Sequence, residues 1–127
     1  MTNPAHHDIT ACARAWQTLR MAHDRVAQRL SAELDGACGL ALNEFDVLLY
    51  LRTHDEVRIS ALLEAVPLSQ PALSRLVARL AERGLITRSK ADDDGRAVDV
   101  CLTEQGTALI NRAIEIHTEV VHETLTS

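Results

Sequence analysis

The chain has 127 residues, which is enough for one domain with its own core and too few for two domains of ordinary size. Its apolar fraction of 46% and charged fraction of 24% are typical of globular proteins, and no apolar run approaches the roughly 20 residues that cross a bilayer. The formal net charge of -5 excludes a uniformly basic nucleic-acid-binding protein.

A long amphipathic helix is predicted from about residue 8 to residue 34. Apolar residues, with one histidine, recur there at steps of three and four and so share one helix face. They are Ile9, Cys12, Trp16, Leu19, His23, Val26, Leu30 and Leu34. We expect Gly36 to end this helix as its C-terminal cap. Asn43 is the expected N-cap of a second helix, EFDVLLYLRT, which is apolar on most sides and therefore expected to be buried.

Two capped helices joined by a tight turn are predicted next. Ser60 is expected to cap the short helix ALLEAV, Pro67 ends it, and Ser69 caps the following helix. The buried stripe of that helix is expected to consist of Leu73, Leu76, Val77 and Leu80. Gly84 stops the helix at a position that favours a left-handed residue. A short helix, a turn and a second capped helix make a helix-turn-helix.

A hairpin and a long helix complete the predicted fold. The strands LITRS at 85–89 and AVDVCL at 97–102 flank the polar loop KADDDGR, and this hairpin makes the helix-turn-helix winged. A last helix is expected from Thr103 to about Leu125. Its apolar face is Leu109, Ile110, Ala113, Ile114, His117, Val120, Val121 and Leu125. The predicted fold class is mainly α: a winged helix-turn-helix with a two- to three-stranded β wing between long N- and C-terminal helices.

Positive charge is concentrated in the winged element. Residues 69–91 carry five basic side chains and one acidic one, a net of +4 (5 − 1), within a chain whose total is -5. The helix face opposite the buried stripe carries Pro71, Ser74, Arg75 and Ala78, flanked by Gln70 and Arg79. Arg and Gln make bidentate bonds with guanine and adenine edges, and small residues let a helix enter the major groove. The alternative is a solvated helix face on which Glu82 pairs with Arg79.

Phosphate and minor-groove contacts are predicted at two further places. Ser69 and the free N–H groups of the first helical turn form a phosphate site. In the hairpin, Arg88 and Lys90 approach the loop along one strand and Arg96 returns on the other, so the tip fits a minor groove. Asp94 is expected to hold the guanidinium of Arg96, two residues away. The alternative is that DDDG is an ordinary acidic turn.

Together these segments resemble the MarR family of winged-helix transcription regulators. The resemblance covers about Leu40 to Leu109 and is carried by LALNEFDVLLYL, LSQPALSRLVARLAERGLITR and DDDGRAVDVCLTEQG. It implies a homodimer with intertwined terminal helices on a pseudo-palindromic double-stranded DNA operator. It divides the chain into a dimerisation helix at 1–36, a DNA-binding lobe at 40–102 and a second dimerisation helix at 103–127. Its functional residues fall on Ser69, Gln70, Pro71, Ser74 and Arg75 of the recognition helix and on Asp94 and Arg96 of the wing.

The resemblance also implies regulation by a small aromatic or phenolic effector. Trp16, Arg20 and His23 lie near one another on the first predicted helix and are the candidate ligand-binding residues. The alternative is that Trp16 and His23 belong to the core or to a dimer interface. Some relatives sense oxidants through a cysteine near the start of the first helix, where Cys12 lies, and a helix start lowers a thiol pKa. The alternative there is a buried, inert cysteine.

The sequence predicts no catalytic, cofactor or metal site. The three cysteines are far apart and form no C-x-x-C pair, and no nucleophile–base pair or phosphate loop is present. The N-terminus lacks the basic and apolar regions of a secretory signal, so we expect a cytoplasmic protein without membrane contact. The predicted function is that of a dimeric repressor released from DNA by a small ligand. The alternatives are a winged-helix protein-interaction module and a cysteine-based redox-sensing regulator.

Overall fold

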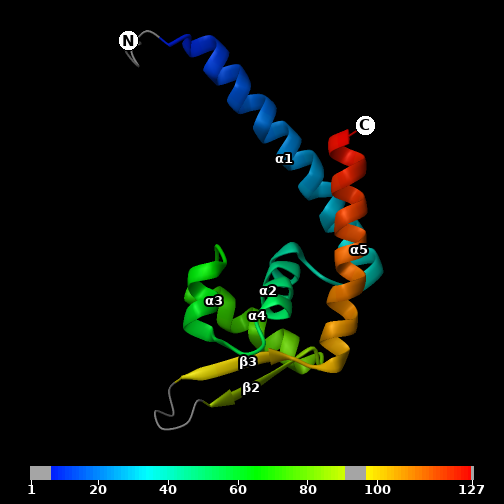
Figure 1. Cartoon of the computed structure of the whole chain (residues 1–127). Helices are drawn as coiled ribbons and strands as arrows, with labels where there is room; N and C mark the ends of the chain where they lie inside the picture. Colours follow the sequence, from blue (N-terminus) through cyan, green and yellow to red (C-terminus); the bar gives the residue numbers. More distant parts are fainter. Residues whose placement is uncertain (1–6, 91–96, 127) are drawn as a thin grey trace.

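The structure is a computed structural model that describes residues 7–90 and 97–126. Within these residues, helices and short strands follow one another in an order that matches the predicted winged helix-turn-helix. They are α1 (Ile9–Cys38), α2 (Leu42–Thr53), β1 (Val57–Arg58), α3 (Ile59–Ala65), α4 (Gln70–Glu82), β2 (Ile86–Lys90), β3 (Val98–Leu102) and α5 (Glu104–Thr126). The elements from α2 to β3 form one lobe, while α5 leads away from it and meets the C-terminal part of α1 (Figure 1). No helix in the described part of the chain combines the length and the apolar character that crossing a membrane requires.

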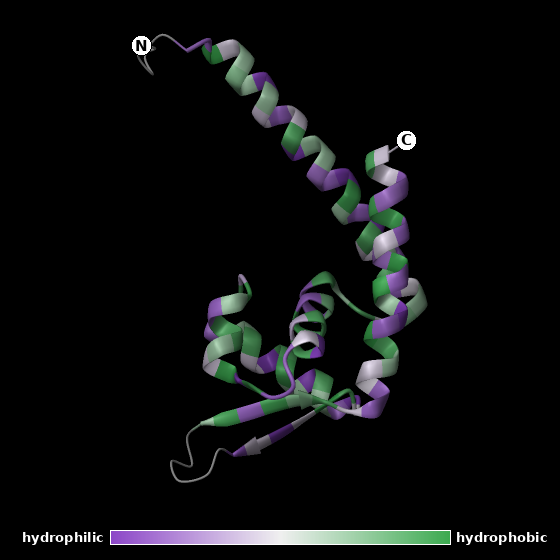
Figure 2. Ribbon diagram, viewed as in Figure 1, coloured by the Kyte–Doolittle hydropathy of each residue, from purple (hydrophilic) through white to green (hydrophobic). Residues whose placement is uncertain are grey.

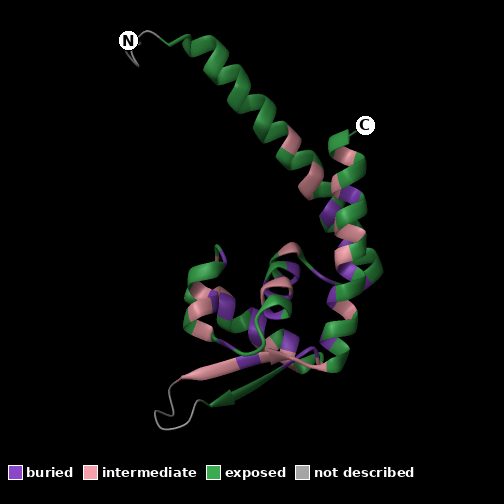
Figure 3. Cartoon of the chain, viewed as in Figure 1, coloured by how far each residue is buried: buried purple, intermediate pink, exposed green. Residues whose placement is uncertain are grey.

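The core lies where α2, α3, α4 and the sheet meet the lower half of α5 (Figure 3). Its fully buried side chains are aliphatic and come from α2, α3, α4 and β3 of the lobe and from both long helices. The largest are Leu34, Leu40, Leu48, Leu62, Leu73, Leu80 and Ile110. Burying one such side chain contributes about 1.5–3 kcal/mol, so this cluster is the main source of stability in the lobe.

Helix α4 has the predicted ends and the predicted buried side. The hydroxyl of Ser69 caps its first turn by accepting the N–H of Ala72 at 3.3 Å. Gly84 follows the helix with φ 77°, a left-handed conformation that favours glycine. The buried residues of α4 are Leu73, Leu76, Val77 and Leu80, as the periodicity predicts. The orientation of this helix about its own axis is therefore fixed by the core.

The sheet has three antiparallel strands in the order β1-β3-β2. The predicted hairpin is confirmed: Ile86 pairs with Leu102 and Lys90 with Val98. Strand β1 is only two residues long, and Val57 pairs with Val100 in the middle of β3. The hairpin projects to one side of the lobe (Figure 1).

The predicted end of the first helix is wrong by one turn. Helix α1 continues through Gly36 to Cys38, and Gly39 is its C-terminal cap. Gly39 has φ 63°, and its N–H donates to the carbonyl of Asp35 at 2.9 Å. Two glycines stand close together in the sequence, and only the second adopts the left-handed conformation that ends a helix.

Two predicted N-caps are also displaced. Helix α2 is capped at Ala41, whose backbone N–H donates to the carboxylate of Glu44 at 2.8 Å, so Asn43 lies inside the first turn. Helix α3 begins directly after β1 with Arg58 as its N-cap, which places Ser60 inside the helix. Each helix therefore begins before the residue that the sequence suggests as its cap. The backbone before α2 is fixed by the carboxylate of Glu44, and the backbone before α3 is fixed by strand β1.

The C-terminal part of α1 packs on α5, and its N-terminal half does not. Leu30, Leu34 and Cys38 are buried, and the carboxylate of Glu123 on α5 accepts a hydrogen bond from Arg29. Beyond this contact α1 diverges from the rest of the chain (Figure 1). Hydrophobic and hydrophilic residues both occur along this part of α1 (Figure 2), and the part is exposed (Figure 3). Ile9 is 81%, Trp16 60% and Leu19 64% exposed.

Helix α2 ties the lobe to α5 through one ring contact and one hydrogen bond. The ring of Phe45 stacks on His117 with the centroids 5.0 Å apart. The Nε of Arg52 donates to the Oδ1 of Asn111 at 2.7 Å. Burial raises the pKa of Asp46, and the nearby His117 partly opposes this shift. The lobe and the long helix are therefore joined by few polar contacts over an aliphatic core.

The junction between α4 and α5 is closely packed around Gly106. The hydroxyl of Thr103 donates to the carbonyl of Gly84 at 2.6 Å and accepts the N–H of Gly106 at 3.0 Å. A Cβ at Gly106 would lie 2.0 Å from the carbonyl oxygen of Leu85. Only a glycine allows the first turn of α5 to lie this near to the start of β2.

We expect Gly106→Ala to lower the free energy of unfolding by about 1–3 kcal/mol or more, because backbone has to move to relieve the clash. Urea unfolding measures the loss. The matched control is Gly36→Ala, where a Cβ meets nothing within 4 Å and the helix should gain about 0.5–1 kcal/mol. A Gly106→Ala protein as stable as the wild type would contradict this packing.

Candidate nucleic-acid interface

The outer face of α4 carries the residues that the sequence predicts. Gln70, Pro71, Ser74, Arg75 and Arg79 are all exposed, opposite the buried stripe. Ala78 lies among them and is half-buried, so no bulky side chain stands at the centre of this face. The arrangement is that of a helix able to approach a groove closely while two guanidinium groups reach outward.

The N-terminal end of α4 combines a cap with the positive end of the helix dipole. Ser69 precedes the helix in an extended conformation, and Pro71 occupies its first turn, where proline costs no internal hydrogen bond. The Ser69 oxygen accepts the N–H of Ala72, which leaves its own O–H free to rotate toward an outside acceptor. An anion placed here would meet a favourable partial charge.

The cationic side chains of this face have no acidic partner in the part of the chain that the structure describes. The ion pairs found there join Arg29 with Glu33 and Glu123, Arg58 with Asp99, and His23 with Asp24. The pairing of Glu82 with Arg79, which would make the face a self-neutralised surface, is not among them. The positive charge of α4 is therefore directed to solvent.

The wing adds two exposed cations on one strand. Arg88 and Lys90 of β2 lie opposite Val100 and Val98 of β3, on the same side of the sheet as Ile86. Ile86 and Val100 are buried, whereas Arg88 and Lys90 are exposed because the hairpin extends past the core. Asp94 and Arg96, the other predicted wing residues, lie outside the described residues.

Arg83 has a structural role that sequence reasoning missed. Its guanidinium donates to the carbonyl of Gly39 at 2.8 Å and to that of Cys38 at 3.2 Å. These bonds tie the end of α4 to the turn between α1 and α2. The acceptors are 44 and 45 residues away, and they are backbone carbonyls that any residue supplies. No local pattern in the sequence signals such a contact.

The candidate effector residues lie on the half of α1 that projects from the rest of the chain. Trp16, Arg20 and His23 are all exposed, and the ring of His23 contacts the carboxylate of Asp24 at 3.3 Å. The single chain therefore does not enclose them. Cys12 is exposed as well, so the alternative of a buried cysteine is wrong for the single chain.

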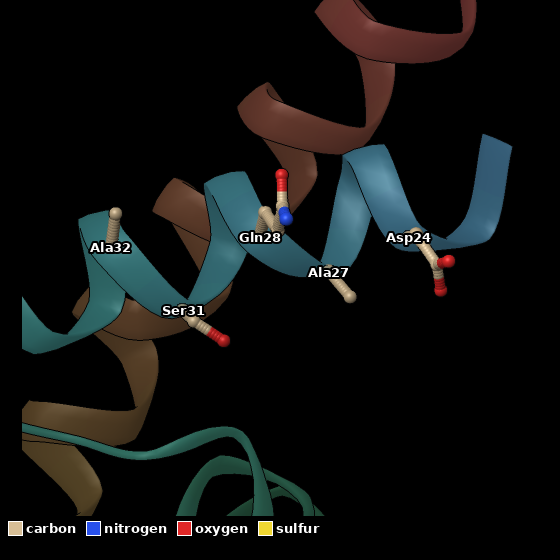
Figure 4. A pocket seen from close by; sticks show the side chains of 5 residues that line it. All are labelled: Asp24, Ala27, Gln28, Ser31 and Ala32. Carbon is tan, nitrogen blue, oxygen red and sulfur yellow. The ribbon is translucent and has the colours of Figure 1, made fainter. Parts of the chain in front are cut away.

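An open hollow of about 580 Å³ lies further along α1. It is lined by Asp24, Ala27, Gln28, Ser31 and Ala32, and Figure 4 shows the short side chains of Ala27 and Ser31 on the side of the helix that faces away from α5. Because these side chains are small, another helix can come close to the backbone of α1 here.

The contact of α1 with α5 shifts the pKa values of Arg29 and Glu123. The hydrogen bond from Arg29 lowers the pKa of Glu123, and the same bond raises the pKa of Arg29. The contribution of this exposed pair to folding stability is therefore present at neutral pH and is lost as the pH falls through the lowered pKa of Glu123.

Within the described residues, no three His, Cys, Asp or Glu side chains are grouped to hold a metal ion.

Three comparisons with known proteins agree on transcription regulators, and two of them name the MarR family. The sequence model of the MarR family matches residues 39–97. An uncharacterized HTH-type transcriptional regulator from Bacillus cereus is 35% identical over 88 residues, which are 69% of this chain and 58% of that protein. AbsC, a MarR family transcriptional regulator from Streptomyces coelicolor, is similar in structure with a TM-score of 0.81 and 26% identity, over 93% of this chain and 79% of that one. Residues 39–97 belong to the MarR family, and the chain shares the fold of its members.

The chain is also similar in fold to a MarR family protein with which it shares less sequence. A second MarR family regulator from Streptomyces coelicolor, solved in complex with DNA, has a TM-score of 0.83 and 22% identity, over 90% of this chain and 73% of that one. The chain spans 58% of the length of the Bacillus cereus relative. The proteins with which it shares sequence and fold are transcription regulators and not enzymes.

Proposed function

We propose that this MarR family protein binds double-stranded DNA sequence-specifically, as a homodimeric repressor that a small molecule releases. The observation that carries the proposal is the outward face of α4, where Arg75 and Arg79 stand beside Ser74 with no acidic partner within the described residues. A family neighbour of the same fold has been solved in complex with DNA. A cytoplasmic location is part of this proposal.

In this proposal α4 is the recognition helix. Gln70 and Arg75 make base contacts, and Ser69 with the first helical turn binds a phosphate. Each good bidentate base contact contributes about 1–3 kcal/mol of discrimination. The acidic total of the chain does not prevent this, because exposed charges are screened over about 8–10 Å and the cationic face is local.

The wing contributes contacts that hold the protein on DNA without selecting a sequence. Arg88 and Lys90 are exposed on the projecting hairpin, and Arg96 follows in the same hairpin of the sequence. Such side chains neutralise phosphates or enter a minor groove. In this proposal Asp94 orients Arg96.

The exposed half of α1 supports a homodimer. A helix that leaves the body of a protein with Ile9, Trp16 and Leu19 exposed gains little stability by itself, because helical stability comes mainly from packing. A second copy related by a two-fold axis would cover this face with the same face of its own α1. The hollow with Ala27 and Ser31 gives room for that approach.

Release by an effector follows from the dimer in this proposal. The second copy would enclose Trp16, Arg20 and His23 and complete a pocket for a small aromatic molecule. Binding there would favour a spacing of the two α4 helices that no longer fits half-sites about one DNA turn apart. The exposed Cys12 supports oxidation of a thiol as an alternative signal.

The assignment of α4 and the wing is tested by alanine variants. Duplexes selected from a random pool serve as the specific target, and unselected duplexes serve as the non-specific one. We expect Arg75→Ala to weaken specific binding about tenfold or more and to relax base preference, because a bidentate contact is lost. Lys90→Ala should weaken both kinds of binding alike. Arg25→Ala, an exposed arginine on α1, is the control that should change neither. If Arg75→Ala and Lys90→Ala both left specific and non-specific binding unchanged, the assignment would be refuted.

The dimer is tested by placing charge on the exposed apolar face of α1. Sedimentation equilibrium should find a dimer for the wild type and a shift toward monomer for the double variant Trp16→Glu, Leu19→Glu, because two carboxylates cannot be buried without partners. Gln17→Glu adds a charge on a neighbouring side of the same helix and should leave the dimer intact. A wild type that stays monomeric, or a double variant that dimerises as tightly as the wild type, would contradict the interface.

A further inference from the structure

One side chain, that of Arg83, joins the ends of two helices. Its Nη1 donates to the carbonyl of Gly39 at 2.8 Å, and its Nη2 donates to that of Cys38 at 3.2 Å. Both acceptors belong to the end of α1, where Gly39 is the C-terminal cap. The backbone of Arg83 is the C-terminal cap of α4, and its N–H donates to the carbonyl of Arg79 at 3.1 Å. Arg83 therefore ends α4 with its backbone and contacts the end of α1 with its side chain.

The end of α1 lacks a cation of its own. The last carbonyls of a helix have no donor within the helix, and the helix dipole places a partial negative charge there. The last turn of α1 contains no basic residue, and it contains Asp35, which adds to the negative charge. Arg83 supplies a positive charge from a distant part of the chain, and its planar guanidinium can donate to two neighbouring carbonyls at once. Charge and geometry both favour this contact.

Both sides of the contact are fixed by the fold. Cys38 and Leu40 are buried, so the backbone between them is held by the core. On the other side, Gly84 follows Arg83 in the left-handed conformation that ends α4. A Cβ at Gly39 would lie 3.4 Å from Nη2 of Arg83, so the guanidinium lies directly against the turn. The link between α4 and α1 is therefore short, and a rotation of one helix against the other has to break it.

We propose that Arg83 is a positioning residue for DNA binding, because it sets the orientation of α4 relative to α1. This role rests on the proposed function, in which α1 carries the dimer surface and α4 carries the DNA-binding face. The distance between the two α4 helices of a dimer then depends on how each α4 is held against its own α1. Arg83 lies at the opposite end of α4 from Gln70, so it acts through the helix and not by touching a base.

A small rotation at Arg83 has a large effect at the other end of α4. The helix has 13 residues and is therefore about 20 Å long. A tilt of about 10° about its C-terminal end moves its N-terminal end by about 3.5 Å, which is close to the rise of one base pair. In a dimer on two half-sites, such a shift changes the spacing at which both α4 helices fit their grooves. A dimer without the link should therefore accept more than one spacing.

The test measures how strictly the protein selects the spacing of two half-sites. A duplex selected from a random pool is lengthened or shortened by one base pair between the half-sites, and a duplex with a single half-site is included. We expect the wild type to bind the selected spacing about tenfold or more tightly than either altered one, because misplaced base contacts are lost. Arg83→Lys keeps the charge but loses the planar fork of donors, so it should lower this ratio about threefold or more and leave the affinity for a single half-site unchanged. Arg112→Lys, at an exposed arginine of α5, is the control that should keep the wild-type ratio.

Loss of stability and loss of position give different results in this test. A variant that is only less stable binds every duplex more weakly by the same factor and keeps the spacing ratio of the wild type. That result would overturn the positioning role, and so would an Arg83→Lys protein that behaves like the wild type.

A measurement without DNA separates this inference from the proposed function. Residual dipolar couplings of the backbone amides, recorded on the full chain labelled with ¹⁵N, report the orientation of α4 relative to the C-terminal part of α1. We expect both helices of the wild type to fit one rigid alignment, whereas α4 of Arg83→Lys should no longer fit the alignment of α1. Couplings that fit one alignment in both proteins would overturn the inference. A wild type that binds no duplex would contradict the proposed function, and the couplings would then decide alone whether Arg83 orients α4.

Discussion

The burial of four aliphatic side chains along one side of α4 is the constraint on which the candidate interface depends. A helix of 13 residues is marginal by itself in water, so the packing of Leu73, Leu76, Val77 and Leu80 both stabilises α4 and fixes its rotation. With these four inside, Ser74 and Arg75 have to point outward. The cap at Ser69 and the left-handed Gly84 fix where the helix starts and stops, and the hydrogen bonds of Arg83 anchor its C-terminal end to the turn after α1. The cationic face is thus a consequence of core packing and does not depend on a loop conformation.

The two long helices differ from the lobe because part of their apolar surface has no packing partner in the same chain. The C-terminal part of α1 is buried against α5, but beyond it the apolar residues are exposed and the pattern continues with the same period. The lobe therefore has its own core, whereas the projecting part of α1 leaves apolar side chains uncovered in the single chain. The contacts at Gly106, the Thr103 hydroxyl and the stack of Phe45 on His117 set how the lobe is held on α5.

Features that depend on local periodicity and caps could be predicted from the sequence, and features that depend on distant contacts could not. The buried stripe of α4, its serine cap and the β2–β3 hairpin follow from spacing and turn residues. The sequence predicts the cap of α1 at Gly36 because two nearby glycines offer the same local signal, and only the fold selects Gly39. Strand β1 is too short for any periodic pattern and exists through its pairing with β3. Arg83 is one of the five basic side chains of residues 69–91, yet its partners are carbonyls on a turn far away in sequence, so no local pattern reveals this contact.

The central claim is that a local cationic face on an acidic protein engages the phosphates of a double helix. Its most direct measurement is the affinity of the wild-type protein for duplex DNA as a function of salt concentration. If α4 and the wing displace counterions, the logarithm of the association constant falls linearly with the logarithm of salt concentration, by about 0.9 for each phosphate neutralised. We expect a slope that corresponds to several phosphates. A flat response, or no duplex binding at low salt, would contradict the claim and would favour a winged helix that binds another protein.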